Sequence, residues 1–547
     1  MDDKLLEIKN LVIEADIHGR WTPILNGLSM LLRRGEIIGL IGESGAGKST
    51  FGLAAMAYTK PGCRIVSGSI KLDGLELTEM TDAELRKLRG NKVAYVAQSA
   101  AASFNPAHTL TEQFVESPVQ HGKMSMAAAR KLSVELFRQL DLPDPETFGD
   151  RYPHQVSGGQ LQRAMTAMAL GSNPDIIIFD EPTTALDVTT QIEVLGAIKE
   201  AVKARHVAAI YISHDLAVVA QMADRIMVLR YGDLIEEGSA RDMLAHPKEE
   251  YTRRLLNVRS FRDARTVEDE DDVQLRIENV TARYPGTHIN VLTDININIV
   301  KGKTVALVGE SGSGKSTLAR VITGLLPPTK GAVKFKGHAL EHHLKDRAKQ
   351  DLQSIQIIFQ MDDVAMNPRQ KIKDIIGRPL EFYLGMKGKK REERVLELLR
   401  QIEIPEGYAE RYPAQLSGGE KQRICIARAL AAEPELIICD EITSALDQLV
   451  AEGILDLLLN LQKKIGISYL FITHDLATVK SIADEIVVMY QGEVVEQGPK
   501  AEILSPPYAP YTELLLSSVP EMNPDWLDNL VDRRKRGEVS TEQGTVP

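Results

Sequence analysis

Two glycine-rich segments predict where this protein binds phosphate. The pattern GxxxxGKS occurs at residues 42–49 and again at residues 309–316, each time after a short apolar run. Glycines let backbone N–H groups approach phosphate oxygens, while the lysine neutralises phosphate charge and the serine hydroxyl can bind Mg²⁺. A plain glycine-rich turn is the alternative, but two matches at corresponding places make coincidence negligible. The predicted loop residues are Gly42, Glu43, Ser44, Gly45, Ala46, Gly47, Lys48, Ser49, Thr50, Gly309, Glu310, Ser311, Gly312, Ser313, Gly314, Lys315, Ser316 and Thr317.

Pairs of acidic residues follow two other apolar runs and predict hydrolysis. Asp180 and Glu181 end the sequence IIIFDE, and Asp440 and Glu441 end LIICDE. The aspartates can complete the Mg²⁺ shell, and the glutamates can polarise a water for attack on the γ-phosphate. A solvated strand end is the alternative, which the phosphate loops make less favourable.

A third motif predicts a second kind of anion site. The sequences VSGGQ and LSGGE supply Ser157, Gly158, Gly159, Ser417, Gly418 and Gly419. Each forms a small turn rich in backbone N–H donors at the start of an amphipathic run. Because the N-terminus of a helix attracts anions, the turn suits a phosphate group.

Apolar runs that end at these motifs predict an α/β fold. The runs do not alternate with polar residues, as expected for parallel strands covered on both faces. Longer amphipathic runs lie between them and predict helices. Ligands of such sheets bind beyond the carboxyl ends of the strands, where the motifs fall. The predicted strands are residues 37–41, 176–179, 208–212, 305–308, 436–439 and 469–472.

The chain is one domain written twice. The first phosphate loop returns 267 residues later, and the SGG and acidic motifs return 260 residues later. We therefore expect a first nucleotide-binding domain at residues 1–258 and a second at 274–522, each with a C-terminal extension. An acidic linker at 259–273 and a polar tail at 523–547 complete the predicted organisation.

Composition limits the other possibilities. The 547 residues are 43% hydrophobic and 26% charged, with a net charge of −11, which argues against broad attachment to nucleic acid or anionic lipid. Three scattered cysteines exclude a disulfide framework and suit a reducing compartment. The first residues do not resemble a secretory signal, and no run of about 18 apolar residues occurs. We expect a cytoplasmic protein without direct membrane insertion, whose membrane role depends on partners.

Together these motifs resemble those of ATP-binding-cassette (ABC) ATPases over nearly the whole chain. The resemblance implies two tandem P-loop NTPase domains, each with a RecA-like parallel-sheet core and a helical signature subdomain. It implies that ATP binds with Mg²⁺ between the phosphate loop of one copy and the SGG turn of the other. The implied Mg²⁺ residues are Ser49, Gln98, Asp180, Ser316, Gln360 and Asp440.

The resemblance also implies roles for further residues. Gln98 and Gln360 would touch Mg²⁺ and the attacking water, and His214 and His474 would contact the γ-phosphate as switch histidines. Surface polarity and a capped strand end are the structural alternatives for these two pairs. Asp187 and Asp447 would cross between cassettes. Tyr284 is the candidate for stacking on adenine in the second copy, whereas the first has Ile17 at the matching position and Trp21 nearby.

Sequence after each cassette narrows the class. HPKEEYTRRLL and PPYAPYTELLLSSVP resemble the extension of peptide, opine and nickel importer ATPases, as do SFNP and AMNP, seven residues past each glutamine. The resemblance implies an ATPase subunit at the inner face of the bacterial inner membrane. Its partners would be two membrane permeases and, through them, an extracytoplasmic substrate-binding protein. Without cysteines in the extension we expect no iron–sulfur cluster. The net negative charge argues against a nucleic-acid partner. A soluble twin-cassette ATPase acting on the ribosome or DNA is the alternative.

Overall fold

The chain folds into two compact units. The computed structural model describes residues 3–17, 19–183, 186–257, 272–360, 365–444 and 446–536. The first unit contains the described residues up to 257 together with residues 520–536, and the second contains residues from 272 to 519. The predicted linker at 259–273 lies outside the described residues except for its last two.

The strands of both units follow the same order along the chain. In the first unit they are β1 (Lys4–Ile17), β2 (Arg20–Arg33), β3 (Ile37–Ile41), β4 (Cys63–Leu72), β5 (Leu75–Glu76), β6 (Val93–Val96), β7 (Ile176–Asp180), β8 (Ala208–Ile212), β9 (Arg225–Arg230) and β10 (Asp233–Ser239). In the second they are β11 (Val273–Ala282), β12 (Leu292–Val300), β13 (Thr304–Val308), β14 (Lys330–Phe335), β15 (His338–Ala339), β16 (Ile355–Ile358), β17 (Leu436–Asp440), β18 (Ser468–Ile472), β19 (Glu485–Tyr490) and β20 (Glu493–Pro499).

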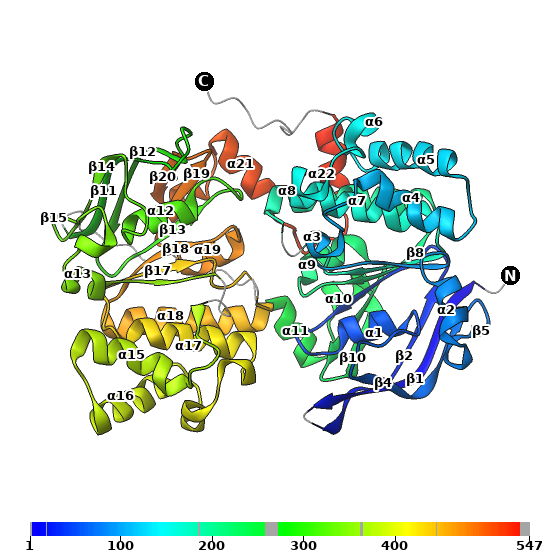
Figure 1. Ribbon diagram of the computed structural model, residues 1–547, viewed down its shortest axis with the longest axis horizontal. Helices are drawn as coiled ribbons and strands as arrows, with labels where there is room; N and C mark the ends of the chain where they lie inside the picture. Colours follow the sequence, from blue (N-terminus) through cyan, green and yellow to red (C-terminus); the bar gives the residue numbers. More distant parts are fainter. Residues whose placement is uncertain are drawn as a thin grey trace. The chain divides into compact units, whose positions relative to one another are not determined.

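The described strands of each unit form two sheets (Figure 1). One of these sheets has six described strands and the other has four. The larger sheets have the orders β10-β9-β3-β8-β7-β6 and β16-β17-β18-β13-β19-β20, in which β3, β7, β8, β13, β17 and β18 pair in parallel with their neighbours. All six predicted strands are therefore confirmed. The smaller sheets, β2-β1-β4-β5 and β12-β11-β14-β15, are antiparallel.

Helices connect the strands. In the first unit they are α1 (Lys48–Ala54), α2 (Asp82–Leu88), α3 (Ala100–Ser103), α4 (Leu110–Gln120), α5 (Met126–Gln139), α6 (Pro145–Phe148), α7 (Gly158–Gly171), α8 (Val188–Ala204), α9 (Leu216–Met222), α10 (Ala240–Ala245), α11 (Glu250–Asn257) and α22 (Trp526–Lys535). In the second they are α12 (Lys315–Ile322), α13 (Lys349–Ser354), α15 (Ile372–Leu384), α16 (Gly388–Gln401), α17 (Gly418–Leu430), α18 (Gln448–Ile465), α19 (Leu476–Ile482), α20 (Lys500–Ile503) and α21 (Pro510–Ser517). No helix among the described residues is long and apolar enough to cross a membrane.

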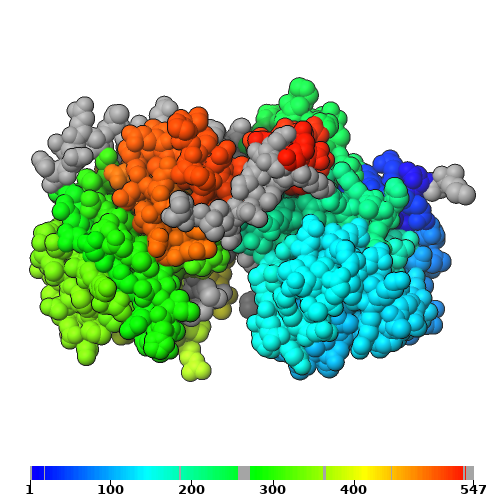
Figure 2. All heavy atoms as spheres, turned by 90° about the horizontal axis from the view of Figure 1, so that it is seen from above, coloured from blue at the N-terminus to red at the C-terminus, as the bar shows by residue number. Residues whose placement is uncertain are grey.

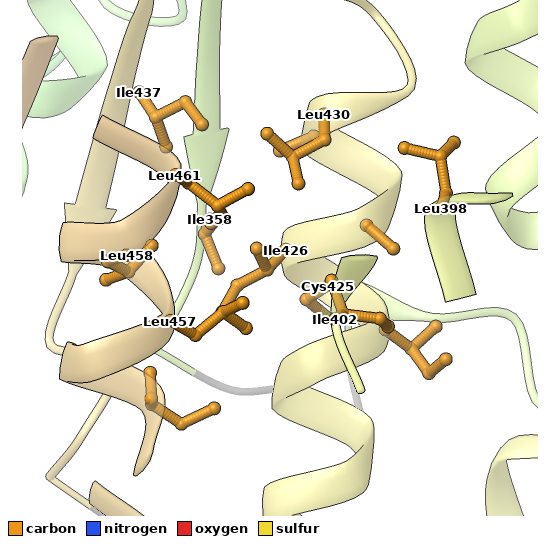
Figure 3. Close-up of a cluster of buried hydrophobic side chains, with 14 of the residues drawn as sticks. Ile358, Leu398, Ile402, Cys425, Ile426, Leu430, Ile437, Leu457, Leu458 and Leu461 are labelled. Atoms are coloured by element: carbon orange, nitrogen blue, oxygen red, sulfur yellow. The ribbon is translucent and has the colours of Figure 1, made fainter. Parts of the chain in front are cut away.

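Apolar packing fixes the edge of the sheet where the motifs lie. In the second unit, side chains from α17 and α18 point toward those of β16 and β17 and form one buried cluster (Figure 3). Ile426 and Leu458, one from each helix, are fully buried there. Burying one such side chain stabilises the fold by about 1.5–3 kcal/mol. It holds the strand that carries the acidic motif against the helix that starts at the SGG turn.

The C-terminal residues differ from the predicted polar tail. Helix α22 packs on α8 of the first unit, where Leu527 is fully buried and Leu530 is 4% exposed. In the space-filling view the red atoms of this helix lie against atoms of that unit (Figure 2). Lys199 Nζ of α8 lies 2.7 Å from Asp528 Oδ1. A single apolar stripe within a polar sequence is enough to seat a short helix, which composition alone does not reveal. Residues 537–547 lie outside the described part of the chain.

Candidate active sites

Both phosphate loops connect a strand of the larger sheet to a helix. One loop joins β3 to α1, and the other joins β13 to α12. Gly42 and Gly309 have φ of 154° and 148°, and a Cβ on either would lie 2.1 or 2.2 Å from a backbone oxygen of the neighbouring strand. Only glycine fits this approach. The first residue of each motif is therefore required by the fold of the loop itself.

The two loop lysines fold back on their own loops. Lys48 Nζ donates to the carbonyl oxygens of Gly42 at 2.6 Å and Glu43 at 3.0 Å. Lys315 Nζ donates to the matching carbonyls, both at 2.7 Å. Both lysines are buried, at 6% and 5% exposure. These contacts place each ammonium group inside its loop. There it is predicted to neutralise the charge of the phosphate that the loop binds.

The aspartates at the ends of β7 and β17 lie beside the loop serines. Ser49 Oγ donates to Asp180 Oδ1 at 2.8 Å, and Ser316 Oγ donates to Asp440 Oδ1 at 3.0 Å. Tyr95 Oη also donates to Asp180 Oδ2 at 2.7 Å, a contact that sequence reasoning missed. Burial and this hydrogen bond raise the pKa of the Tyr95 hydroxyl, so it stays protonated. The second unit has an isoleucine at the matching position, so the first aspartate makes this tyrosine contact and the second does not.

In the first unit, the predicted base lies between the other two predicted catalytic residues. Gln98 Nε2 donates to Glu181 Oε2 at 3.1 Å, and His214 Nδ1 lies 3.3 Å from the same oxygen. Burial lowers the pKa of His214, but the hydrogen bond and charge of Glu181 outweigh it, and the pKa is raised. Glu181 adopts φ of 48°, a left-handed conformation that costs energy in a residue with a side chain. The local fold therefore turns this carboxylate out of the strand direction.

The second unit repeats the arrangement. Gln360 Nε2 donates to Glu441 Oε2 at 2.6 Å, His474 Nδ1 lies 3.5 Å from Glu441 Oε1, and φ of Glu441 is 51°. Burial raises the pKa of Glu441, but His474 and Lys315 outweigh it, so the pKa is lowered. Burial lowers the pKa of His474, but the hydrogen bond with Glu441 and the charge of Glu441 outweigh it, so the pKa is raised. Burial also raises the pKa of Asp440, and the hydrogen bond from Ser316 offsets this rise only in part.

The SGG turns and the D-loop aspartates begin helices. Ser157 and Ser417 are the N-caps of α7 and α17, where each side chain accepts a backbone N–H in a capping box. Asp187 and Asp447 are the N-caps of α8 and α18, where each side chain accepts a backbone N–H without a capping box. A Cβ on Gly159 would lie 2.3 Å from a methyl group of α8, so this glycine also serves helix packing. The roles of the SGG turns and of these two aspartates in nucleotide binding remain predictions.

The candidate adenine-stacking residues differ between the units. Tyr284 follows β11, and its hydroxyl lies 3.2 Å from Thr317 Oγ1 and accepts from Arg320 Nη1 at 2.9 Å. The ring is thus held against the helix that starts at the phosphate loop. In the first unit Ile17 is 51% exposed, and the guanidinium carbon of Arg64 lies 3.9 Å from the centroid of the Trp21 ring.

Family comparison covers the segments that hold most of these residues. A family model described as ABC transporter matches residues 25–184 and 292–444, more than half of the chain. The chain belongs to the ABC transporter family. A second model, the C-terminal region of oligopeptide/dipeptide transporters, matches residues 495–544 of this ABC protein.

Relatives of this ABC protein align over almost its whole length. It is 37% identical to the glutathione import ATP-binding protein GsiA of Escherichia coli O157:H7, over 95% of this chain and 90% of the relative. It is 35% identical to the protein of that name from Pectobacterium atrosepticum, over 98% and 92%.

Among solved structures, the dimeric ATP-binding cassette MJ0796 bound to ADP and Pi is 27% identical, with a TM-score of 0.39, over 43% of this chain and 98% of that one. The cassette cbiO1 from Clostridium perfringens is 30% identical, with a TM-score of 0.38, over 43% and 91%.

Family membership confirms the expected class. The protein carries two tandem ABC ATPase domains, and it is an ATPase that couples ATP binding and hydrolysis to transport. The relatives do not favour the alternative of an ATPase acting on the ribosome or DNA.

Proposed function

We propose that this ATPase drives bacterial uptake of glutathione or similarly short peptides. The observation that carries the proposal is the peptide-transporter C-terminal region at residues 495–544. Relatives named for glutathione import, which align over 90% or more of both chains, support the same class of solute. The partners would be two membrane permeases and an extracytoplasmic substrate-binding protein, with the ATPase at the inner face of the inner membrane.

Each phosphate loop binds the ATP phosphates in this proposal. The loop backbone offers N–H donors, and Lys48 or Lys315 exchanges its loop carbonyls for phosphate oxygens. The side-by-side oxygens of Ser49 and Asp180 and of Ser316 and Asp440, 2.8 and 3.0 Å apart, fit a hard divalent cation. Bound Mg²⁺ would neutralise charge on the β- and γ-phosphates.

Glu181 and Glu441 act as the bases that orient and deprotonate the attacking water. Gln98 and Gln360 orient each carboxylate, since both already donate to it. The histidines have raised pKa values in contact with the same carboxylates, which suits a positive charge close to the γ-phosphate. Pairing of each loop with the SGG turn and D-loop aspartate of the other cassette, which the resemblance implies, belongs to the same proposal.

A pair of double variants tests the site roles. Lys48→Ala with Lys315→Ala should abolish tight ATP binding, whereas Glu181→Gln with Glu441→Gln should keep binding and stop turnover. Unchanged phosphate release by the glutamate variant would reject the assigned base. If the isolated first domain is a monomer and hydrolyses ATP as fast as the full chain does, the proposal of sites shared between the two cassettes is rejected.

Transport is tested in cells that lack the chain. Uptake of labelled glutathione should return with the wild-type chain and not with the glutamate double variant, and unlabelled short peptides should compete. Restoration of neither glutathione nor peptide uptake would reject the proposed solute. Crosslinks from residues 104–119 and 366–380, which overlap α4 and α15, should capture permeases. Co-purified ribosomal protein or DNA would instead support the alternative.

A further inference from the structure

The extension after each cassette touches the phosphate loop of its own unit. Tyr251 of α11 accepts a hydrogen bond through Oη from the backbone N–H of Glu43 at 3.2 Å. Tyr511 of α21 accepts one from the backbone N–H of Glu310 at 3.0 Å. Both rings are buried, at 6% and 9% exposure. Each tyrosine belongs to a YT pair, in HPKEEYTRRLL or in PPYAPYTELLL, so one sequence feature makes one contact twice.

The same loop residues are held from a second direction. The carbonyls of Gly42 and Glu43 accept from Lys48, while the N–H of Glu43 donates to Tyr251. Consecutive backbone groups at the start of the loop are therefore fixed by one residue of the loop and one of the extension. An unpaired buried N–H is costly, so the tyrosine hydroxyl favours one loop conformation over others.

Different neighbours hold the two rings. The guanidinium carbon of Arg230 lies 4.7 Å from the centroid of the Tyr251 ring. At the matching position of the second unit, Tyr490 packs against Tyr511 with ring centroids 4.5 Å apart. The surroundings changed between the copies, and the contact between hydroxyl and loop did not. General packing is thus a poorer explanation of the repeated tyrosine than the contact itself.

Each extension is also fastened to its own sheet. The carboxylate of Glu236 on β10 accepts from the backbone N–H groups of Lys248 and Glu249, at 3.0 and 3.1 Å, directly before α11. In the second unit the hydroxyl of Thr512 donates to Glu496 on β20. These anchors give each tyrosine a fixed base from which its hydroxyl reaches the loop.

We propose that Tyr251 and Tyr511 are positioning residues for ATP binding. Each hydroxyl holds the start of the phosphate loop in the conformation that receives phosphate, and so makes the C-terminal extension part of the nucleotide site. The inference rests on the proposed role of the loops. Once ATP is bound, contacts with phosphate also hold the loop, so loss of the hydroxyl should raise KM and leave kcat nearly unchanged.

The test is the full chain carrying Tyr251→Phe and Tyr511→Phe, which keeps both rings and removes only the hydroxyls. KM for ATP should rise about fivefold, equivalent to about 1 kcal/mol, with kcat within about twofold of wild type. Tyr508→Phe is the matched control, because this tyrosine lies in the same extension and its hydroxyl contacts the carbonyl of Leu504 at 3.5 Å instead of the loop. An unchanged KM in the double variant would overturn the proposal.

Hydrogen exchange supplies a readout independent of turnover. Tyr251→Phe alone should speed amide exchange in the first loop only, and Tyr511→Phe alone in the second loop only. If, in each single variant, the two loops exchange their amide hydrogens at the same rate, the proposal is also overturned. Lys48→Ala with Lys315→Ala separates the two levels of inference: if that variant binds ATP normally, the assignment of the loops fails, and if it does not, the tyrosine result stands by itself.

Discussion

Replacing Gln221 with leucine should release the C-terminal segment from the first unit. Gln221 lies on α9 and is 1% exposed. Its Nε2 donates to the carbonyls of Glu521 and Asn523 at 2.6 and 2.7 Å, and its Oε1 accepts from the N–H of Leu527 at 3.0 Å. One side chain therefore satisfies three backbone groups that lead into α22. Leucine keeps much of the volume and removes all three hydrogen bonds.

The size of the effect follows from those contacts. At about 1 kcal/mol for each hydrogen bond, docking of residues 520–531 should weaken by about 3 kcal/mol. Amide exchange in that segment should then become faster by about 150-fold. The ion pair of Arg241 with Asp525 is exposed and should retain little of the lost stability. Burial of Leu527 remains, so the helix should dock more weakly without the whole unit unfolding.

Hydrogen exchange of the full chain, read by mass spectrometry on peptides covering 520–531, measures this change. Ser481→Ala is the matched control, since Ser481 occupies the corresponding position on α19 and donates to the carbonyl of Thr478 at 2.8 Å. Exchange in 520–531 should be unaltered by the control. If Gln221→Leu leaves that exchange within twofold of wild type, Gln221 does not hold the segment and our account of its docking is incorrect.

Two further predictions concern the candidate active sites. Tyr95→Phe should leave the fold intact and lower the free energy of unfolding of the first unit by about 1 kcal/mol. It should also change the Mg²⁺ dependence of ATP hydrolysis, and identical Mg²⁺ curves would refute a role for Tyr95 beside the aspartate proposed to bind Mg²⁺. His474→Gln should destabilise the second unit by about 1 kcal/mol in a pH-dependent way. The pKa of Glu441 is lowered from 4.5, so its contribution to folding stability is present above pH 4.5 and is lost on further acidification. The pKa of His474 is raised from 6.5, so its contribution to folding stability is present below pH 6.5 and is lost as the pH rises through the raised value. The difference from wild type in urea unfolding should be largest between pH 4.5 and 6.5 and shrink at pH 9, and a difference independent of pH would contradict the ion pair.

Local sequence determined much of the fold and of the site. Apolar runs without alternation predicted six parallel strands, because a strand covered on both faces needs apolar residues at every position. Glycine spacing predicted the loops, because only glycine permits the approach seen at Gly42. Since parallel strands end at one edge of a sheet, the same patterns also placed the phosphate loops and the acidic pairs at that edge. The resemblance to ABC ATPases, and not the local pattern, implied that Gln98 and His214 join them.

Tertiary structure decided the contacts that join segments distant in sequence. Tyr95 contacts Asp180 because β6 and β7 are neighbours in the sheet, and nothing in the local pattern of VAYV distinguishes that tyrosine from a core residue. Tyr251 contacts the first loop across 208 residues of sequence, and Leu527 reaches Gln221 across 306. Such contacts depend on how whole elements pack. The family resemblance therefore indicated an extension, and composition indicated a tail, without showing what either one contacts.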